Sequence, residues 1–89
     1  MNIGYALIRT KQGMKEEVYN RLTDLDLLDK NQDARIAECV KVYSQGTRSY
    51  SLIAKIEAKD IKEVSKFVES RIKTLEGVVE TEVLLGIRF

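Results

Sequence analysis

The 89-residue chain contains no histidine, no proline and no tryptophan, and its single cysteine is Cys39. Without histidine the chain cannot build a Ser-His-Asp or Cys-His catalytic system, a His-ligated haem or most common zinc sites. A lone cysteine forms no internal disulfide or thiolate cluster, which is typical of a reducing compartment. We therefore expect a cytoplasmic protein with no metal and no cofactor.

Long apolar runs are also absent from the sequence. None approaches the roughly 18 residues that a membrane span requires, and the first residues lack the basic and apolar order of a signal peptide. The 15 basic and 14 acidic side chains leave a net charge of +1, which is too small for binding driven by phosphate neutralisation. We expect no membrane association and no direct binding to nucleic acid.

A folded domain is nevertheless indicated, because 44% of the residues are hydrophobic and 33% are charged. Such a chain can bury a core and solvate its surface. A length of 89 residues leaves no room for a second core. We predict one domain spanning residues 1–89.

The first half of the chain alternates between strand and helix patterns. Residues 3–10 are apolar on both parities, as in a strand covered on two sides. From Met14 to about Asp29 the apolar residues have helical spacing, and Glu16 and Glu17 occupy the first turn, where they offset the helix dipole. Ile36, Val40 and Val42 then alternate with Ala37, Cys39 and Tyr43 in a second strand.

The second half repeats this order after a turn at residues 44–47. Tyr50, Leu52, Ala54 and Ile56 share one face of a third strand, which forms a hairpin with the second. Asp60 and Glu63 predict a capped helix from Ile61, and Gly77 suits the left-handed end of that helix. Its apolar stripe comprises Ile61, Val64, Phe67, Val68, Ile72 and Leu75. A fourth strand reaches Phe89, with Val79, Thr81, Val83, Leu85 and Ile87 on one face.

The order β-α-β-β-α-β predicts the ferredoxin-like α+β fold, an antiparallel four-stranded sheet with two helices on one face. Because the first strand is apolar on both parities and Leu84 lies on the opposite parity of the fourth, the second face of the sheet needs a cover. We expect a sheet-to-sheet homodimer of the dimeric α+β barrel type.

Several residue groups resemble reaction centres, and each has a simpler interpretation. Glu80 and Glu82 share a face and would suit general acid/base catalysis, but exposed charges usually line a solvated face. The aspartates of residues 24–29 lack the glycine and terminal glutamate of an EF-hand loop. Cys39 has no adjacent cation, which favours a core thiol over a reactive one.

RNA recognition by aromatic side chains on the sheet is a further alternative. Residues 48–53 match the start of an RNA-recognition octamer, but they lack its glycine and its last aromatic residue. Tyr5 and Tyr50 are therefore interpreted as sheet-face residues at an interface.

The turn after the second strand is the best candidate for a ligand site. Gly46 leaves the backbone accessible, and Thr47, Arg48 and Ser49 supply donors that suit a small zwitterion. An ordinary hairpin loop is the alternative, because loop composition alone is a weak signal.

Two phrases resemble the effector domain of the Lrp/AsnC family of amino-acid-responsive transcription regulators. They are residues 46–53, GTRSYSLI, and residues 75–83, LEGVVETEV, joined by the capped helix. The likeness extends from the opening strand through Gly13 to the fourth strand. Ser49 stands where the family pattern has aspartate, Glu76 replaces a proline, and Val83 replaces the second of two threonines, the first being Thr81.

The resemblance implies a stand-alone effector domain, also called a RAM domain, that acts as an amino-acid-binding and oligomerisation module. It implies ligand-binding residues Gly46, Arg48, Ser49 and Thr81, no catalytic residues, homodimers assembled into a ring of dimers, and transcription regulation through a partner such as a full-length relative. Because the chain begins with a strand, no helix-turn-helix is expected. A small enzyme of the dimeric α+β barrel class is the alternative function.

Overall fold

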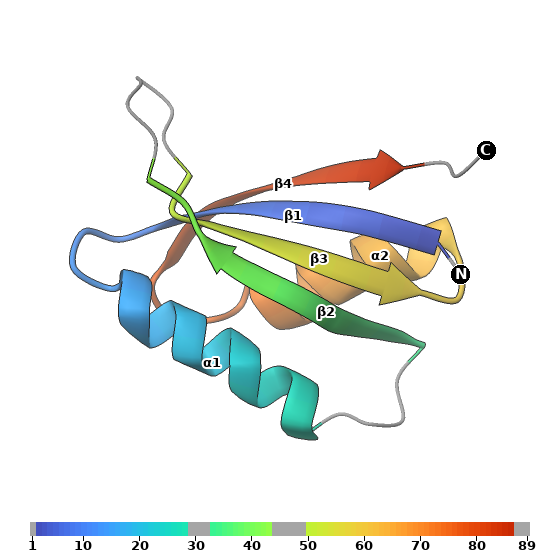
Figure 1. The fold of residues 1–89 in the computed structure, drawn as a ribbon, viewed down its shortest axis with the longest axis horizontal. Coiled ribbons are helices and arrows are strands. Elements are labelled where there is room, and N and C mark those ends of the chain that lie inside the picture. Colours follow the sequence, from blue (N-terminus) through green and yellow to red (C-terminus); the bar gives the residue numbers. More distant parts are fainter. Residues whose placement is uncertain (1, 29–32, 44–49, 87–89) are drawn as a thin grey trace.

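The computed structural model describes residues 2–28, 33–43 and 50–86 (Figure 1). Its elements follow the order β-α-β-β-α-β, which confirms the predicted ferredoxin-like fold. The elements are β1 (Asn2–Thr10), α1 (Lys15–Leu28), β2 (Ala34–Lys41), β3 (Leu52–Ala58), α2 (Ile61–Phe67), the π-helical turn η1 (Val68–Ile72) and β4 (Val78–Gly86).

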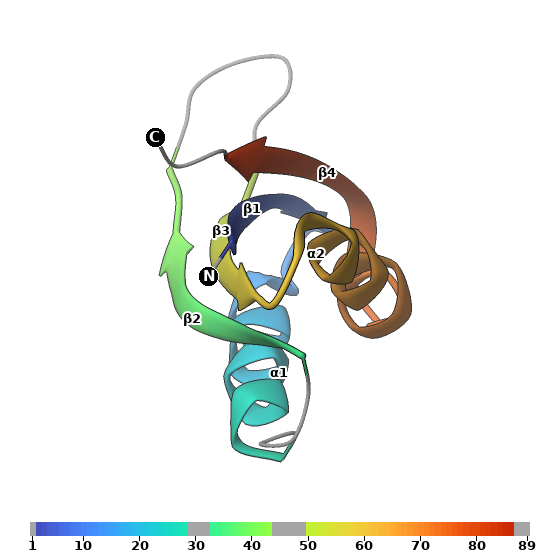
Figure 2. The ribbon, with the colours of Figure 1, turned by 90° about the vertical axis from the view of Figure 1, so that its right-hand side faces the viewer.

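The four strands form one antiparallel sheet in the order β2-β3-β1-β4. Strands β1 and β3 are central, and β2 and β4 are the two edges. Figure 2 shows α1 and α2 on the same side of the sheet. We call this side the helix face and the opposite side the open face.

The core lies between the helix face and the two helices. From the sheet, Ala6, Ile8, Leu52 and Ile56 are fully buried. They pack in one cluster with the apolar stripes of the helices. The helix residues that are fully buried in this cluster are Val18, Leu22, Val64, Val68 and Ile72.

Helix α1 closely follows its predicted limits. It begins at Lys15 and carries Glu16 and Glu17 in its first turn, and it ends at Leu28. Helix α2 begins at Ile61 as expected, because the Asp60 side chain accepts a hydrogen bond of 3.0 Å from the backbone N–H of Glu63.

The second helix differs from expectation in its last part. Residues Val68–Ile72 form a π-helical turn, in which the backbone N–H of Lys73 donates to the carbonyl of Val68 at 2.8 Å. The buried stripe is preserved, because Val68 and Ile72 are both fully buried. After this turn Gly77 has φ of 95°, so it takes the positive-φ conformation that was predicted for it.

Two β-bulges change the predicted faces of the edge strands. In β2 the pairing with β3 shifts between Ile36 and Glu38, which leaves Ala37 as an extra residue. Ile36 is therefore buried, whereas Val40 is 41% exposed on the open face. The expectation that Ile36 and Val40 share a face was wrong, because a bulge reverses the parity of the residues that follow it.

The second bulge lies in β4. Glu80 pairs with Arg9 and Val78 pairs with Thr10, so Val79 is the extra residue. Val79 is 53% exposed, and its expected place on the same face as Thr81 was wrong for the same physical reason. The predicted end of this strand at residues 87–89 lies outside the described residues.

Close packing of α2 on β1 depends on the absence of a side chain at Gly4. A Cβ atom at this position would overlap the side chain of Val64. We predict that Gly4→Ala lowers the free energy of unfolding by about 1–3 kcal/mol through overpacking. Denaturant unfolding would measure this loss.

Val64→Ala provides the matched control, because it removes the atoms that the new methyl group would meet. In this background Gly4→Ala should cost less, with a coupling energy of about 0.5–3 kcal/mol. Strictly additive effects of the two substitutions would contradict the proposed contact.

Candidate functional site

Three of the four predicted ligand-binding residues, Gly46, Arg48 and Ser49, lie outside the described residues. The fourth, Thr81, is half-buried in β4 and pairs with Ile8 of β1. The structure therefore fixes the strand that carries Thr81 but not its relation to the loop residues. The ligand site remains a prediction.

The base of the hairpin that follows residue 49 is tied to the central strand. The backbone N–H of Ser51 donates to the carbonyl of Ile8 at 2.8 Å. The hydroxyl of Ser51 accepts a hydrogen bond of 3.0 Å from the hydroxyl of Thr10. Tyr50 reaches further, since its hydroxyl donates to the carboxylate of Glu82 on β4. The hairpin base thus contacts the residue next to Thr81.

Glu80 and Glu82, the candidate acid/base pair, are both exposed and both have partners. Glu80 forms an ion pair of 2.5 Å with Arg9, and these side chains are 46% and 41% exposed respectively. Glu82 accepts the hydrogen bond from Tyr50. These contacts agree with the interpretation of this pair as part of a solvated face.

The other side of the hairpin is anchored to α1 by cations and aromatic rings. The ammonium of Lys15 donates to the carbonyl of Val42 at 2.7 Å and lies 3.7 Å from the centre of the Tyr43 ring. Lys41 lies 2.5 Å from Glu16, and this hydrogen bond raises the pKa of the Lys41 ammonium. The sequence analysis did not identify this cluster, although Lys15 at the start of α1 and Lys41 and Tyr43 at and just after the end of β2 are all visible in the sequence.

The open face carries an apolar patch across all four strands. We define the open-face patch as Tyr5, Leu7, Val40, Ile53 and Leu84. Val40, Ile53 and Leu7 lie in one row of paired residues, and Tyr5 and Leu84 lie in the next. Tyr5 is 39% exposed and Leu84 is 48% exposed.

Charged residues border this patch. Glu38 and Lys55 stand in the same row as Tyr5, and with Val40 and Ile53 they line a hollow of about 230 Å³. One row further, Arg35 and Glu57 form an ion pair of 3.3 Å. The face therefore has an apolar centre with a rim of both charge signs, as protein interfaces have.

Within residues 2–28, 33–43 and 50–86, no three acidic or cysteine side chains gather into a group that could hold a metal ion. No helix in those ranges is long and apolar enough to cross a membrane.

Cys39 lies on β2 and packs against the core, as the sequence interpretation expected. Desolvation by burial raises the pKa of its thiol to about 11. The thiolate is the reactive form of cysteine. At neutral pH the thiol is therefore protonated and a poor nucleophile.

This burial predicts a pH dependence of stability. Below pH 9 the thiol is protonated in both states and has no effect on the free energy of unfolding. Between pH 9, the ordinary value, and about 11, the unfolded chain loses the proton while the folded chain keeps it, so stability falls as the pH rises. Urea unfolding at several pH values would give the free energy of unfolding of wild type and of Cys39→Ala. Between pH 9 and about 11 this free energy should fall more steeply with pH in wild type than in Cys39→Ala. Equal slopes in the two proteins would contradict the burial of the thiol.

Comparisons with known proteins give structural matches only. No family model and no curated protein matches the sequence. FFRP-DM1 superposes with a TM-score of 0.74 and 23% identity, over 98% of this chain and 100% of its own. The transcriptional regulator NMB0573 from Neisseria meningitidis, in complex with L-Met, has a TM-score of 0.68 and 11% identity over 98% of this chain and 50% of its own. At these identities the likeness shows a shared fold.

The match to TTHA0845 from Thermus thermophilus is stronger. Its TM-score is 0.77 with 30% identity, and the alignment covers 100% of this chain and 96% of that chain. Similarity of both sequence and fold over nearly the full length of two chains indicates common descent. The chain belongs to the same protein family as TTHA0845.

Proposed function

We propose that this protein is a small-molecule-binding and oligomerisation domain of the Lrp/AsnC family, which regulates transcription through protein partners. The observation that carries the proposal is the superposition on the full length of FFRP-DM1, a protein of that family. The same domain covers half of a regulator solved with bound L-Met. The two Lrp/AsnC-like phrases of the sequence provide independent support.

The open-face patch supports a homodimer. Two helices lie on one side of the sheet, so nothing within the described chain covers Tyr5, Val40 and Leu84, each between 39% and 48% exposed. A second copy offers the same apolar centre and the same mixed rim, as a two-fold symmetric interface requires. Association also compensates for the limited apolar area that a small domain buries alone. Further assembly of dimers into a ring follows from the family resemblance.

The effector site is proposed at the hairpin loop, with Gly46, Arg48 and Ser49 beside Thr81. Contacts of the hairpin base with β1 and with Glu82 bring it close to β4, the strand that carries Thr81, although Glu82 lies on the open face and Thr81 on the helix face. Because Ser49 replaces an aspartate, the loop lacks a countercharge for an ammonium group, and Arg48 adds a cation. An acidic or otherwise anionic amino-acid-like effector is favoured.

The alternative, an enzyme of the dimeric α+β barrel class, is less well supported. Such an enzyme needs a polar base inside the cavity between sheet and helices. Among the described residues, the buried set contains no polar or charged side chain. A regulatory domain places no such requirement on its core.

Adjacent leucines on β4 test the dimer. Leu84 lies on the open face opposite Tyr5, and Leu85 lies on the helix face opposite Gly4. Their exposed fractions are 48% and 46%. Leu84→Asp should dissociate the dimer, because it would bury an unpaired charge in the interface, whereas Leu85→Asp should leave it assembled. Analytical ultracentrifugation at micromolar concentration measures both. A monomeric wild type, or equal dissociation of both variants, would refute the interface.

The effector is tested by a thermal-shift screen of the standard amino acids and of small aromatic metabolites, because a bound ligand raises stability. Ser49→Asp should then improve the affinity for neutral amino acids by about 1 kcal/mol, the difference between neutral and charge-assisted hydrogen bonds. Calorimetry on both proteins gives the values. Tight binding of a neutral amino acid by wild type, unchanged by Ser49→Asp, would place the site elsewhere.

A further inference from the structure

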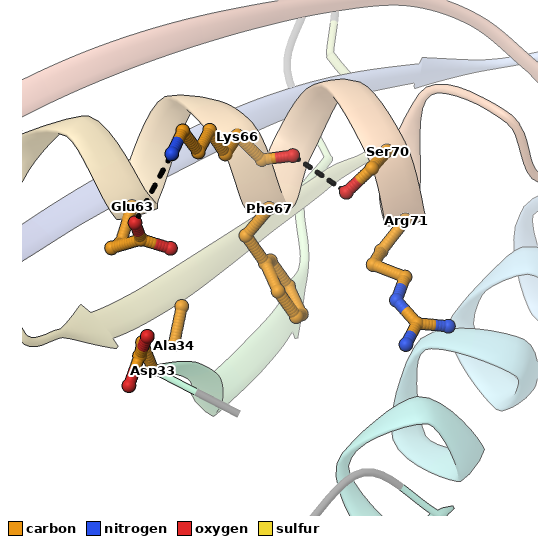
Figure 3. A pocket seen from close by; sticks show the side chains of 7 residues that line it. All are labelled: Asp33, Ala34, Glu63, Lys66, Phe67, Ser70 and Arg71. Atoms are coloured by element: carbon orange, nitrogen blue, oxygen red, sulfur yellow. Dashed lines mark hydrogen bonds and ion pairs between the residues drawn. The ribbon is translucent and has the colours of Figure 1, made fainter. Parts of the chain in front are cut away.

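A pocket of about 370 Å³ lies between α2, η1 and the start of β2 (Figure 3). This volume is at the lower end of the range of small-molecule sites. Ala34, the first residue of β2, and Asp33 just before it line one side of the pocket. Glu63, Phe67 and Arg71 line the other side from the second helix. The pocket thus joins two segments that are distant in the sequence.

Charges of opposite sign occupy opposite ends of this pocket. Figure 3 shows the carboxylates of Asp33 and Glu63 at one end and the guanidinium of Arg71 at the other, with the Phe67 ring between them. Phe67 and Ala34 are each 6% exposed, so the middle of the pocket is apolar and its side chains are buried. The arrangement is an end with two carboxylates and the Lys66 ammonium, an apolar floor, and an end with the Arg71 guanidinium.

The π-helical turn coincides with this pocket. Ser70 and Arg71 both belong to η1 and both line the pocket. A π turn inside an α-helix is rare and is found frequently at functional sites. Its position here is an observation independent of the charges, and it points to the same place.

We propose that this pocket binds a small amphoteric molecule whose ammonium and carboxylate groups are separated by an apolar spacer, such as an ω-amino acid. The ammonium pairs with Asp33 and Glu63, the spacer lies against Phe67, and the carboxylate binds Arg71. An α-amino acid with an uncharged side chain carries both charged groups on one carbon, whereas an ω-amino acid places an apolar spacer between them. The ligand class follows from the order of the lining groups, which is carboxylates, then the Phe67 ring, then the Arg71 guanidinium.

Arg71 is the group that receives the carboxylate. The Ser70 hydroxyl already donates to the carbonyl of Lys66 at 2.7 Å, so it offers lone pairs rather than a proton. Arg71 takes part in another interaction within the chain, but a guanidinium has several N–H donors in a planar fork. A carboxylate of the ligand would bind this fork in addition to that interaction or in competition with it.

Lys66 competes with the ligand at the acidic end. Its ammonium lies 3.4 Å from Glu63, but the Lys66 side chain is 72% exposed. Exposed ion pairs contribute little to stability, so a ligand ammonium displaces this one at low cost. Removal of the Lys66 charge should therefore tighten ligand binding.

The pocket does not include Thr81, which is the described residue of the proposed effector site. It lies beside β2, whereas Thr81 lies on β4, and β3 and β1 stand between these edge strands. The inference is therefore independent of the proposed function, and the two sites are tested by different variants.

The experiment is calorimetry on the full chain with 6-aminohexanoate and norleucine, which are isomers that differ only in the position of the amino group. Shorter ω-amino acids, from glycine to 5-aminopentanoate, complete the series. We expect affinity to rise with spacer length, and 6-aminohexanoate to bind at least about tenfold more tightly than norleucine, as a lost charged contact implies. Equal affinities of the two isomers, or binding of neither, would overturn the proposal.

Variants locate the site. Glu63→Gln and Arg71→Gln should each weaken 6-aminohexanoate binding about tenfold, and Lys66→Gln should strengthen it. Glu63→Gln preserves the helix cap, because the Asp60 side chain accepts its hydrogen bond from the backbone N–H of residue 63. This variant is therefore expected to fold, and it tests the pocket even if Arg71→Gln unfolds the protein. Ser49→Asp should leave this binding unchanged. Loss on Ser49→Asp, or no effect of the pocket substitutions, would show that the pocket is not the site.

Discussion

Two helices can cover only one face of a four-stranded sheet, and the rest of this structure follows from that constraint. The covered face has small residues, Gly4 and Ala6, where α2 packs on it. Among the described residues, no polar or charged side chain is buried there. The open face has the opposite composition, with Tyr5 and Leu84 at its centre and ion pairs such as Arg35–Glu57 at its rim. A monomer leaves this apolar area in water, which is unfavourable in proportion to the area. The open face is therefore the surface on which the proposed homodimer depends.

The element order could be predicted from the sequence because each signal was local. Helical spacing defined α1, and Asp60 and Gly77 bounded the second helix by capping and by positive φ. The two bulges and the π turn could not be predicted in this way. Each inserts one residue into a regular repeat, at Ala37, at Val79 and within η1, and nothing in the local composition distinguishes the extra residue from its neighbours. The insertion is decided by the pairing and packing of other segments.

The same reasoning explains which parts of the sites were visible in the sequence. The hairpin loop could be identified because the residues of its motif are contiguous in the sequence. The strand that carries Thr81 could be predicted from its alternating β-branched residues. The pocket beside η1 was not visible, because its acidic end combines Asp33 with Glu63, thirty positions along the chain by their numbers. Each of these residues alone is an ordinary surface charge. Only the tertiary contact of β2 with the second helix brings the pair into one pocket.

The proposed dimer interface and the pocket lie on different sides of the sheet, so neither proposal excludes the other. A direct packing route nevertheless joins them, because Val64 of α2 meets the backbone of β1 at Gly4, and the next residue, Tyr5, belongs to the open-face patch. A ligand that shifts α2 by even a few tenths of an ångström has no free volume there to absorb the movement, since Val64 is fully buried. Any coupling that results must be reciprocal, because an effect of the ligand on association implies an equal effect of association on ligand affinity. Ligand affinity measured at several protein concentrations would therefore report the coupling without any variant.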